Sequence, residues 1–500
     1  MPDYLYPGVY VEEISSGSKP IESVATAVAA IIGNTYGGAE DEPVFISSFK
    51  DYVDNFGQTA GSADMVGNYV QAFYNNGGGS AYVISTNVVK KAKAGLYDTD
   101  GKEILKILAD EFGKEAGDIT ISLSKKMNAT VTTEVDAVLL DINSSGTATE
   151  ITDLLSVSDL TAAVNENLKA VKCKLSVSVT ALKNIFALLP EEAAVDGPLE
   201  LIVTGGAEPL SETIAANETK SPKTIAFEKG ITLVEKIDSA TMILLPEVSL
   251  GSGLTSNSIY ASAIAQCEKL MDRMVFIDPP KSEELDANSS IPINSSYTAL
   301  YYPWIDIGAG NYIAPSAFAA GMWGKIDKRR GVWKAPAGME TGLLGVSRFK
   351  YSVNNAEQEG LNPKGVNVLR KVNGVPVVWG SRTLASKSDP EWRYVPVRRT
   401  FMMVEESIRE GIQWAVFEPN SLNLWQALKI NIESFLNGLW RAGAFQGATS
   451  DQAFFVRCGL GQTMTQGDVD AGRVIVEAGI APLKPAEFVI IRIQQKVAQV

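Results

Sequence analysis

The sequence contains no histidine among its 500 residues, and this absence narrows the chemistry that the chain can perform. Without an imidazole there can be no Ser-His-Asp or Cys-His catalytic site, no histidine metal site and no histidine pH switch. Most classes of hydrolase are therefore excluded.

Cysteine is also scarce. Cys173, Cys267 and Cys458 are odd in number and far apart in the sequence. Neither a disulfide framework nor a zinc-binding spacing is present. We expect these side chains to be buried thiols, and we expect no metal or cofactor.

Long apolar runs and excess positive charge are missing as well. The longest apolar run, 24–32, is far shorter than the roughly 20 residues that a membrane helix needs. Asp3 stands where a secretory signal would carry Lys or Arg. We therefore expect folding in the bacterial cytoplasm without direct membrane insertion. The net charge of −14 argues against nucleic acid as a partner, because binding it requires a basic face.

What is present indicates several domains, since 500 residues exceed the usual size of one core. Apolar segments at 24–32 and 81–85 enclose a helical pattern at 62–75. Segments 241–249 and 274–280 enclose another at 258–272, so an α/β domain is predicted. The Gly77-Gly78-Gly79 triplet follows a helix and lacks a following Lys-Ser or Lys-Thr, which favours a helix end and turn over a phosphate cradle.

Residues 90–225 differ in composition from the rest. They contain three aromatic side chains, no arginine and more acidic than basic residues. Alternating patterns at 119–124, 174–179 and 199–206 predict strands. We expect an inserted, solvated surface domain, for which carbohydrate or receptor binding remains an alternative.

Two carboxylates follow predicted strands of the α/β domain. Glu247 and Asp278 come at the carboxyl ends of these strands, where α/β sheets place ligands. A hydrolase with paired carboxylates is one reading. The other is that each carboxylate caps a helix or turn, which the lack of a metal cluster or phosphate loop favours.

The C-terminal third is rich in tryptophan and arginine. All eight tryptophans lie between Trp304 and Trp440, and all fourteen arginines lie from Arg273 onward. These residue types are enriched at binding hot spots, although a tryptophan-rich core is the alternative. Arg329, Arg330 and Lys334 surround Trp333. Such a cluster suits nucleic acid in general, but on an acidic chain an ion-pair surface between subunits is favoured.

Two amphipathic helices are predicted within 392–439. Apolar spacing from Phe401 to Val416 predicts the first helix, with Thr400 as its N-cap. Ser421 is the expected N-cap of the second helix, whose apolar positions extend to Leu439.

Each end of the chain carries a short isolated strand pattern. Near the start it comprises Val9, Tyr10, Val11 and Glu12, and near the end Phe488, Ile490 and Ile491 belong to an apolar segment at 487–493. An isolated strand needs a partner edge. That edge belongs either to the chain's own sheet or to the sheet of a neighbouring subunit.

Several segments together resemble contractile tail sheath proteins of bacteriophages and contractile injection systems. The strongest lie at 392–428, 443–459 (GAFQGATSDQAFFVRCG) and 472–493 (GRVIVEAGIAPLKPAEFVIIRI). Further pieces follow in the same order: YPGVYVEE at 6–13, NNGGGSAYVI at 75–84, GKIDKRRGVWKAPAG at 324–338, LNPKGVNVLR at 361–370 and WGSRTL at 379–384. Only about residues 90–225 match weakly.

This resemblance implies an α+β multidomain fold. Its middle domain is α/β, subtilisin-like without the triad, and its C-terminal domain is α+β with exchanged terminal strands. The inserted outer domain is β-rich. The expected boundaries are an N-terminal arm at 1–20, a middle domain at 21–89 and 226–380, an insertion at 90–225, a C-terminal domain at 381–484 and a C-terminal arm at 485–500.

The resemblance also implies a structural subunit without catalysis. Copies stack as hexameric rings around an inner tube and contract to drive it through a target envelope, together with baseplate and terminal cap proteins. Lys429 and Arg441 are candidates for contact with the tube. The alternatives are a hydrolase using Glu247 and Asp278, or a non-contractile surface-layer assembly protein. The kind of particle, phage tail, tailocin or injection system, stays open.

Overall fold

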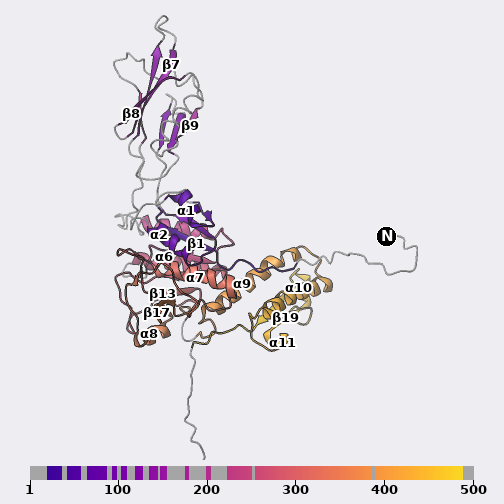
Figure 1. Cartoon of the computed structure of the whole chain (residues 1–500). Coiled ribbons are helices and arrows are strands. Elements are labelled where there is room, and N and C mark those ends of the chain that lie inside the picture. Colours follow the sequence, from indigo (N-terminus) through magenta and orange to yellow (C-terminus); the bar gives the residue numbers. More distant parts are fainter. Residues whose placement is uncertain are drawn as a thin grey trace, which may run out of the picture.

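The computed structural model describes residues 20–35, 42–57, 65–86, 222–249, 254–385 and 389–487, together with seven strands between Lys93 and Val203 (Figure 1). Mixed α/β structure with several sheets is confirmed.

The largest element is an eight-stranded sheet in the order β18-β17-β13-β12-β11-β1-β3-β2. The six inner strands run parallel, and β18 and β2 close the edges in antiparallel pairing. The inner strands are almost entirely buried, as expected when helices cover both faces of a parallel sheet. The strands are β1 (Ala29–Gly33), β2 (Val44–Ile46), β3 (Ala81–Ser85), β11 (Met242–Leu244), β12 (Met274–Ile277), β13 (Thr298–Tyr302), β17 (Val366–Val372) and β18 (Val375–Val378).

Helices cover this sheet in two pairs. Helix α2 connects β1 with β3, and α6 connects β11 with β12, in opposite directions across the sheet. Because such crossovers are right-handed, the two helices lie on opposite faces. Helix α2 packs with α7, and α6 packs with α5. The bounds are α1 (Phe49–Phe56), α2 (Met65–Asn75), α5 (Pro222–Val234), α6 (Leu254–Leu270) and α7 (Pro315–Arg330).

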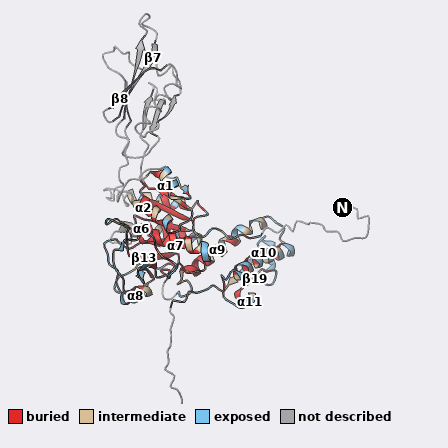
Figure 2. Ribbon diagram, in the orientation of Figure 1, coloured by how far each residue is buried: buried red, intermediate tan, exposed pale blue. Residues whose placement is uncertain are grey.

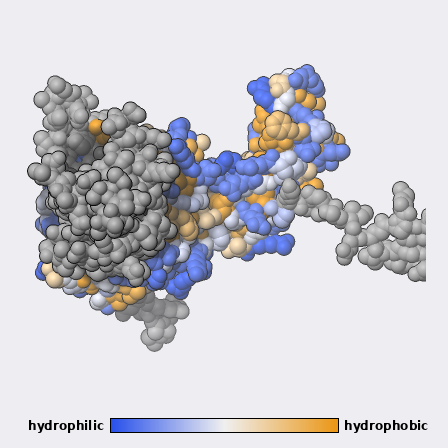
Figure 3. Space-filling view, turned by 90° about the horizontal axis from the view of Figure 1, so that it is seen from above, coloured by the Kyte–Doolittle hydropathy of each residue, from blue (hydrophilic) through white to orange (hydrophobic). Residues whose placement is uncertain are grey.

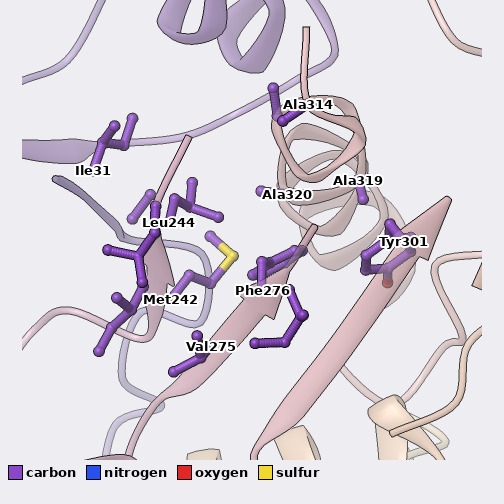
Figure 4. Close-up of a cluster of buried hydrophobic side chains, with 14 of the residues drawn as sticks. Ile31, Met242, Leu244, Val275, Phe276, Tyr301, Ala314, Ala319 and Ala320 are labelled. Carbon is purple, nitrogen blue, oxygen red and sulfur yellow. The ribbon is translucent and has the colours of Figure 1, made fainter. Parts of the chain in front are cut away.

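Helix α7 approaches its neighbours closely because small residues face them. Ala319 and Ala320 lie between the helix and the sheet near Tyr301 and Phe276, and Ala314 lies at the start of the helix (Figure 4). A Cβ on Gly321 would lie 2.6 Å from the carbonyl oxygen of Phe73 in α2. Any larger side chain at position 321 would therefore push the two helices apart.

The glycine triplet forms the turn after α2. Gly77 has φ +98°, a left-handed conformation that glycine adopts without strain. The neighbouring Asn76 side chain accepts from Leu344 N at 2.9 Å and donates to Ala72 O at 2.9 Å. The predicted helix end and turn are confirmed.

The seven strands between Lys93 and Val203 pair among themselves in two antiparallel sheets, β10-β6-β7-β8 and β4-β5-β9. The strands predicted at 119–124, 174–179 and 199–206 are confirmed, with somewhat different ends. The bounds are β4 (Lys93–Tyr97), β5 (Glu103–Ala109), β6 (Ile119–Met127), β7 (Val135–Ser144), β8 (Thr147–Leu154), β9 (Leu175–Val179) and β10 (Leu199–Val203).

Short elements complete the large domain around β13 and β17. A three-stranded sheet has the order β15-β14-β16. Helix α8 begins with a capping box in which Asn354 and Glu357 exchange hydrogen bonds. The bounds are β14 (Ile305–Asp306), β15 (Tyr312–Ile313), β16 (Arg348–Phe349), α8 (Asn355–Leu361) and the 3₁₀ helix η3 (Asn362–Lys364).

The C-terminal part contains the two predicted helices. The elements are α9 (Val395–Gly411), the 3₁₀ helix η4 (Gln413–Ala415), α10 (Leu422–Arg441), α11 (Ser450–Ala453), β19 (Phe454–Cys458), α12 (Gln466–Asp470) and β20 (Val476–Ile480). Ser421 is the N-cap residue of α10, as predicted, although its side chain makes no capping hydrogen bond.

The first helix differs from the prediction at both ends. Thr400 is not its N-cap, because α9 begins at Val395 and Pro396 fits the first turn, where no N–H is needed. The Thr400 hydroxyl instead donates to Pro396 O at 2.6 Å. The helix ends at Gly411, so Val416 lies beyond it and is 63% exposed.

Helix α9 connects two hydrophobic cores. Val395 and Met402 belong to the core of the large sheet, whereas Met403 and Val404 pack with α10. Figure 2 shows the densely buried sheet and the smaller, more exposed part that carries α10 and β19.

The buried cationic side chain of Arg399 holds the N-terminal half of α9 in place. Arg399 pairs with Asp327 of α7 at 2.5 Å, and the two side chains are 3% and 6% exposed. The Arg399 guanidinium also lies 4.3 Å from the ring centroid of Trp323. This pair joins α9 to the large sheet's helix layer.

The cysteine prediction is confirmed for two of the three residues. Cys267 and Cys458 are buried free thiols. Burial raises the pKa of both thiols. Cys173 lies outside the described residues.

Candidate subunit-contact surface

The small sheet formed by β19 and β20 has two open outer edges within the described part of the chain. Phe454 pairs with Ile480 and Cys458 with Val476 in antiparallel register. No third described strand joins either edge. Unpaired N–H and C=O groups along an edge strand accept an additional strand readily.

The two faces of this sheet differ. Val456 and Cys458 are buried and belong to the cores that β19 shares with α10. Phe455 and Arg457 point the other way, and Phe455 remains 48% exposed with its ring against Gly479. Helix α10 thus packs on one face of the sheet, and no described strand pairs with either edge.

The segment that leaves β20 is anchored to the large domain. Arg382 donates from Nε to Glu487 Oε1 at 2.9 Å, and its Nη2 pairs with Glu487 Oε2. Tyr394 Oη donates to the same carboxylate at 3.3 Å. The hydrogen bond to the Glu487 carboxylate raises the pKa of Arg382. Glu487 is the last described residue before 488–500.

The start of the described chain is anchored to α9. Val24 N donates to Ser407 Oγ at 3.1 Å, and Arg399 Nη2 donates to Thr26 O at 2.8 Å. Ile21 packs so closely on Gly411 that an added Cβ there would lie 2.6 Å from it. The described chain therefore starts from a fixed position on α9.

The residues predicted for the two arms lie outside the described part of the chain. Val9, Tyr10, Val11 and Glu12 in the N-terminal arm lie outside the described residues. Phe488, Ile490 and Ile491 in the C-terminal arm do so as well. Their pairing with another subunit stays a prediction.

The candidate tube-contact residues lie on α10. Lys429 pairs with Glu433 at 3.7 Å, and both side chains are about two-fifths exposed. Arg441 is exposed at the last position of the helix. Exposed apolar side chains, Leu422 and Ile430, share this helix, and apolar patches reach the surface in this part of the molecule (Figure 3).

The hydrolase candidates follow neighbouring parallel strands, as predicted, but each has a structural role. Asp278 is 1% exposed, and it accepts from Ser316 N at 3.0 Å and from Ser316 Oγ at 2.5 Å. It therefore caps the first turn of α7. Burial raises the pKa of Asp278 to about 7, against the lowering effect of the two hydrogen bonds from Ser316.

Glu247 lies where the strand order of the large sheet reverses, between β11 and β1. Its Oε2 accepts from Asn34 N at 2.5 Å, which ties the end of β11 to the end of β1. A Cβ on Gly33 would lie 2.7 Å from Val66, so the space there is packed with side chains. Ser316 is itself fully buried, and a substrate cannot reach it. The capping interpretation fits these contacts.

The described residues contain no cluster of three or more Asp, Glu or Cys side chains that could hold a metal ion. They also contain no helix that is long and apolar enough to cross a membrane.

Family models match this chain over its second half. The model of the phage tail sheath protein central domain matches residues 240–384, and that of the phage tail sheath C-terminal domain matches residues 387–496. The chain belongs to the phage tail sheath family. The motif resemblance seen in the sequence is thereby confirmed.

Curated sheath proteins share part of this chain. A putative prophage major tail sheath protein of Pseudomonas aeruginosa is 24% identical over 209 residues, which are 40% of this chain and 53% of the relative. The tail sheath protein of Escherichia phage P2 is 23% identical over 48% of this chain and 61% of its own length. This sheath protein thus spans between half and two thirds of these relatives.

Solved structures resemble the sheath protein over nearly its whole length. The helical sheath of the anti-feeding prophage in its contracted state is 25% identical, with a TM-score of 0.59 over 99% of this chain and 100% of that one. The contracted sheath complex of an extracellular contractile injection system is 24% identical, with a TM-score of 0.60 over 99% of each chain. A sheath tail protein of Listeria innocua shares the fold at 14% identity, with a TM-score of 0.56 over 94% of this chain and 96% of that one.

The sequence did not assign a role to the Arg382–Glu487 pair. Arg382 lies in the WGSRTL motif and Glu487 in the final quoted segment, so both positions carried the resemblance. The two residues are 105 positions apart in the sequence, so only the fold brings them into contact.

Proposed function

We propose that this protein is the subunit of a contractile sheath that polymerises around an inner tube and shortens to drive that tube through a target envelope. Copies stack as hexameric rings in a helical array and are assembled in the bacterial cytoplasm, as part of a phage tail or injection particle. The partners are other copies, the tube protein, and the baseplate and cap proteins. Neither catalysis nor a cofactor is needed.

The observation that carries this proposal is the small sheet with two open edges in a chain of the sheath family. The edges of β19 and β20 accept the terminal arms of neighbouring copies, with Val9, Tyr10, Val11 and Glu12 in one arm and Phe488, Ile490 and Ile491 in the other. Backbone pairing provides affinity, and alternate side chains set the register. Both arms start from anchored positions, at 20–26 and at Glu487.

The domain organisation follows the same proposal. The arms comprise 1–20 and 485–500, the α/β middle domain 21–89 and 226–380, the surface insertion 90–225 and the C-terminal domain 381–484. The C-terminal domain faces the tube, and the insertion is outermost.

Contraction requires two states of one lattice that differ in contact free energy. Assembly on the tube holds the extended lattice in the state of higher free energy, and release lets subunits move as rigid bodies and bury more surface between them. Arms that bend near Ser15–Ser18 and Pro482–Pro485 keep neighbours connected while the lattice shortens. No nucleotide is consumed in this scheme.

Electron microscopy of the purified protein tests the proposal. We expect the full chain to form long, ribbed, hollow cylinders and a variant lacking residues 1–19 to stay dispersed. Val9→Pro with Val11→Pro should act like the deletion, because proline removes the N–H groups that pair. Val9→Thr with Val11→Thr keeps both N–H groups and the strand propensity, so it is the matched control and should assemble. Dispersed particles for the full chain at all salt and protein concentrations would refute self-assembly.

The tube contact is tested separately by charge reversal on α10. Lys429→Glu with Arg441→Glu should leave sheath assembly intact but abolish co-sedimentation with the tube protein. Lys236→Glu with Lys371→Glu changes the net charge equally at exposed positions elsewhere and should retain binding. Equal tube binding by both double variants would remove α10 from the tube interface.

A further inference from the structure

A cavity of about 900 Å³ separates the large domain from the C-terminal helices. Its walls come from the loop after α7, helix α8, strand β17, segment 379–381 after β18, the turn after α10 and segment 483–487. Three residues of the basic and aromatic cluster noted in the sequence, Arg330, Trp333 and Lys334, line the cavity. Trp379 provides a second indole from the segment after β18.

Two buried polar atoms in the cavity wall have no hydrogen-bond partner among the described residues. They are Ser381 Oγ, in a residue that is 4% exposed, and Arg370 Nε. The Arg370 Nη1 group is used, since it donates to Gln358 Oε1 at 2.9 Å. Both atoms lie beneath the cavity surface, so the groups that a ligand can reach are the charged ends of the cationic side chains that line the cavity.

The charges of the lining favour an anionic ligand. The lining contains four cations, Arg330, Lys334, Arg370 and Lys484, and two acids, Glu359 and Glu487. Glu487 is paired with Arg382, and Arg330 is paired with Glu340 at 2.6 Å, so Lys334, Arg370 and Lys484 exceed the one remaining acid. This basic lining belongs to a chain whose net charge is −14. Charge-assisted hydrogen bonds make a carboxylate a suitable ligand for it.

The cavity continues the line of the small sheet. Strand β20 ends at Ile480, Pro482 bridges to Phe445, and segment 483–487 then forms a cavity wall. A strand that pairs with the outer edge of β20 in parallel orientation would therefore leave the sheet toward the cavity.

We propose that the cavity receives the acidic end of the N-terminal arm of a second copy, with Glu12 and Glu13 bound by Lys334, Arg370 and Lys484. In the sequence these two glutamates follow directly after Val9–Val11, the segment that the proposed function assigns to the edge of β20. The C-terminal arm is the wrong partner, since 488–500 contains Arg492 and Lys496 but no acid. This inference rests on the proposed arm exchange and adds a charge-selective end point to it.

Charge reversal and compensation test this assignment in the full chain. Lys334→Glu with Lys484→Glu, and separately Glu12→Lys with Glu13→Lys, should each raise the protein concentration needed for cylinder formation about tenfold or more. The chain that combines all four changes should assemble within about threefold of the original, because the ion pairs are restored with opposite sign. Lys236→Glu with Lys371→Glu serves as the control and should not change this concentration.

Photo-crosslinking gives a direct readout that does not depend on assembly strength. With p-benzoylphenylalanine replacing Trp379, irradiation of cylinders from mixed ¹⁴N and ¹⁵N chains should produce adducts between position 379 and a peptide within 1–19 of another copy. Adducts with 488–500, with the same copy, or with no arm peptide would overturn the inference.

The outcomes separate this inference from the proposed function. If deletion of 1–19 abolishes cylinders while both charge reversals assemble normally, arm exchange holds and the cavity assignment is wrong. If reversal impairs assembly but the combined chain is not rescued, the assignment is also wrong. If the unaltered chain forms no cylinders, the proposed function falls and the inference with it.

Discussion

At the scale of single residues, buried charges decide how the domains are joined. Arg399 forms an ion pair with Asp327, lies over the indole ring of Trp323 and donates a hydrogen bond to the carbonyl oxygen of Thr26. One guanidinium thus connects α9, α7 and the segment before β1. Arginine suits this position because its planar group can stack and donate at the same time.

Removal of the Asp327 carboxylate tests this connection. We expect Asp327→Ala to lower the stability of this part of the chain by about 3–5 kcal/mol, because Arg399 remains buried without its counter-charge. Tryptophan fluorescence during urea unfolding measures the effect, since all eight tryptophans lie between Trp304 and Trp440. The control is Asp54→Ala, which breaks an exposed pair with Lys50 and should leave the midpoint unchanged. Equal midpoints for both variants would contradict a structural role for the buried pair.

Asp278 makes stability depend on pH in the direction opposite to most carboxylates. Its pKa in the folded chain is about 7, above the ordinary value of 3.8. Between these values the folded state binds the proton and the unfolded state does not, so this group's stabilising contribution is full below pH about 4 and is lost as pH rises through about 7. Burial causes this shift, because desolvation disfavours the charged form.

Replacement of this carboxyl isolates its effect. The melting temperature of the original protein should fall relative to that of Asp278→Asn as the pH rises from 5 to 8, because the amide cannot ionise yet can still accept from Ser316 N. Melting curves of both proteins in matched buffers provide the comparison. A constant difference between them across this pH range would show that Asp278 does not titrate there.

At the scale of elements, glycine allows close helix packing only where another backbone lies against its Cα. Gly321 in α7 and Gly438 in α10 are both helical, but an added Cβ meets the Phe73 carbonyl at 2.6 Å in the first case and nothing within 4 Å in the second. Alanine favours a helix over glycine by about 1 kcal/mol. The two sites therefore respond to the same substitution with opposite sign.

We expect Gly321→Ala to destabilise the protein by about 1–3 kcal/mol, since backbone at the end of α2 must move. Gly438→Ala should instead stabilise it by up to about 1 kcal/mol, because it gains helix propensity without a clash. Urea midpoints of the unassembled proteins measure both changes. Stabilisation by both substitutions would mean that α7 and α2 can separate at little cost.

Local pattern predicted elements well where one periodicity dominated. The strands around Ile31, Ile243 and Val275 were expected because continuous apolar runs flanked helical patterns, and the capping role of Asp278 was one of two stated readings. The start of α9 was missed because Thr400 is a good N-cap by residue type, whereas Pro396 is an equally good first-turn residue four positions earlier. Local signals do not rank such alternatives.

The subunit-contact surface was predictable in kind but not in detail. Resemblance indicated which segments belong to the C-terminal domain, whereas the isolated strands of the two arms lie outside the described residues and stay predictions. The cavity and the Arg382–Glu487 pair join segments far apart in the sequence, so no local pattern contains them. Contacts of that kind follow from the assembled fold.

At the scale of the whole molecule, Glu487 connects the root of the C-terminal arm to the large domain. Arg382 holds its carboxylate on two sides, Tyr394 adds a third hydrogen bond, and the Arg382 side chain is only 9% exposed. Force passing along an exchanged arm would reach the large domain through this contact. If the arm pairs with a neighbour, as proposed, the anchored root reduces the conformational entropy that is lost in this pairing.

Loss of this anchor should affect assembly more than folding. Glu487→Ala should slow cylinder growth and raise the concentration at which cylinders first form, because an arm with a free root loses more entropy on pairing. Light scattering and electron microscopy follow the assembly, and thermal unfolding of the unassembled chain should change less than the assembly does. Glu283→Ala removes an exposed acid of equal charge and should assemble like the original. If Glu487→Ala assembled at the original rate and concentration, the Arg382–Glu487 pair would have no role in assembly.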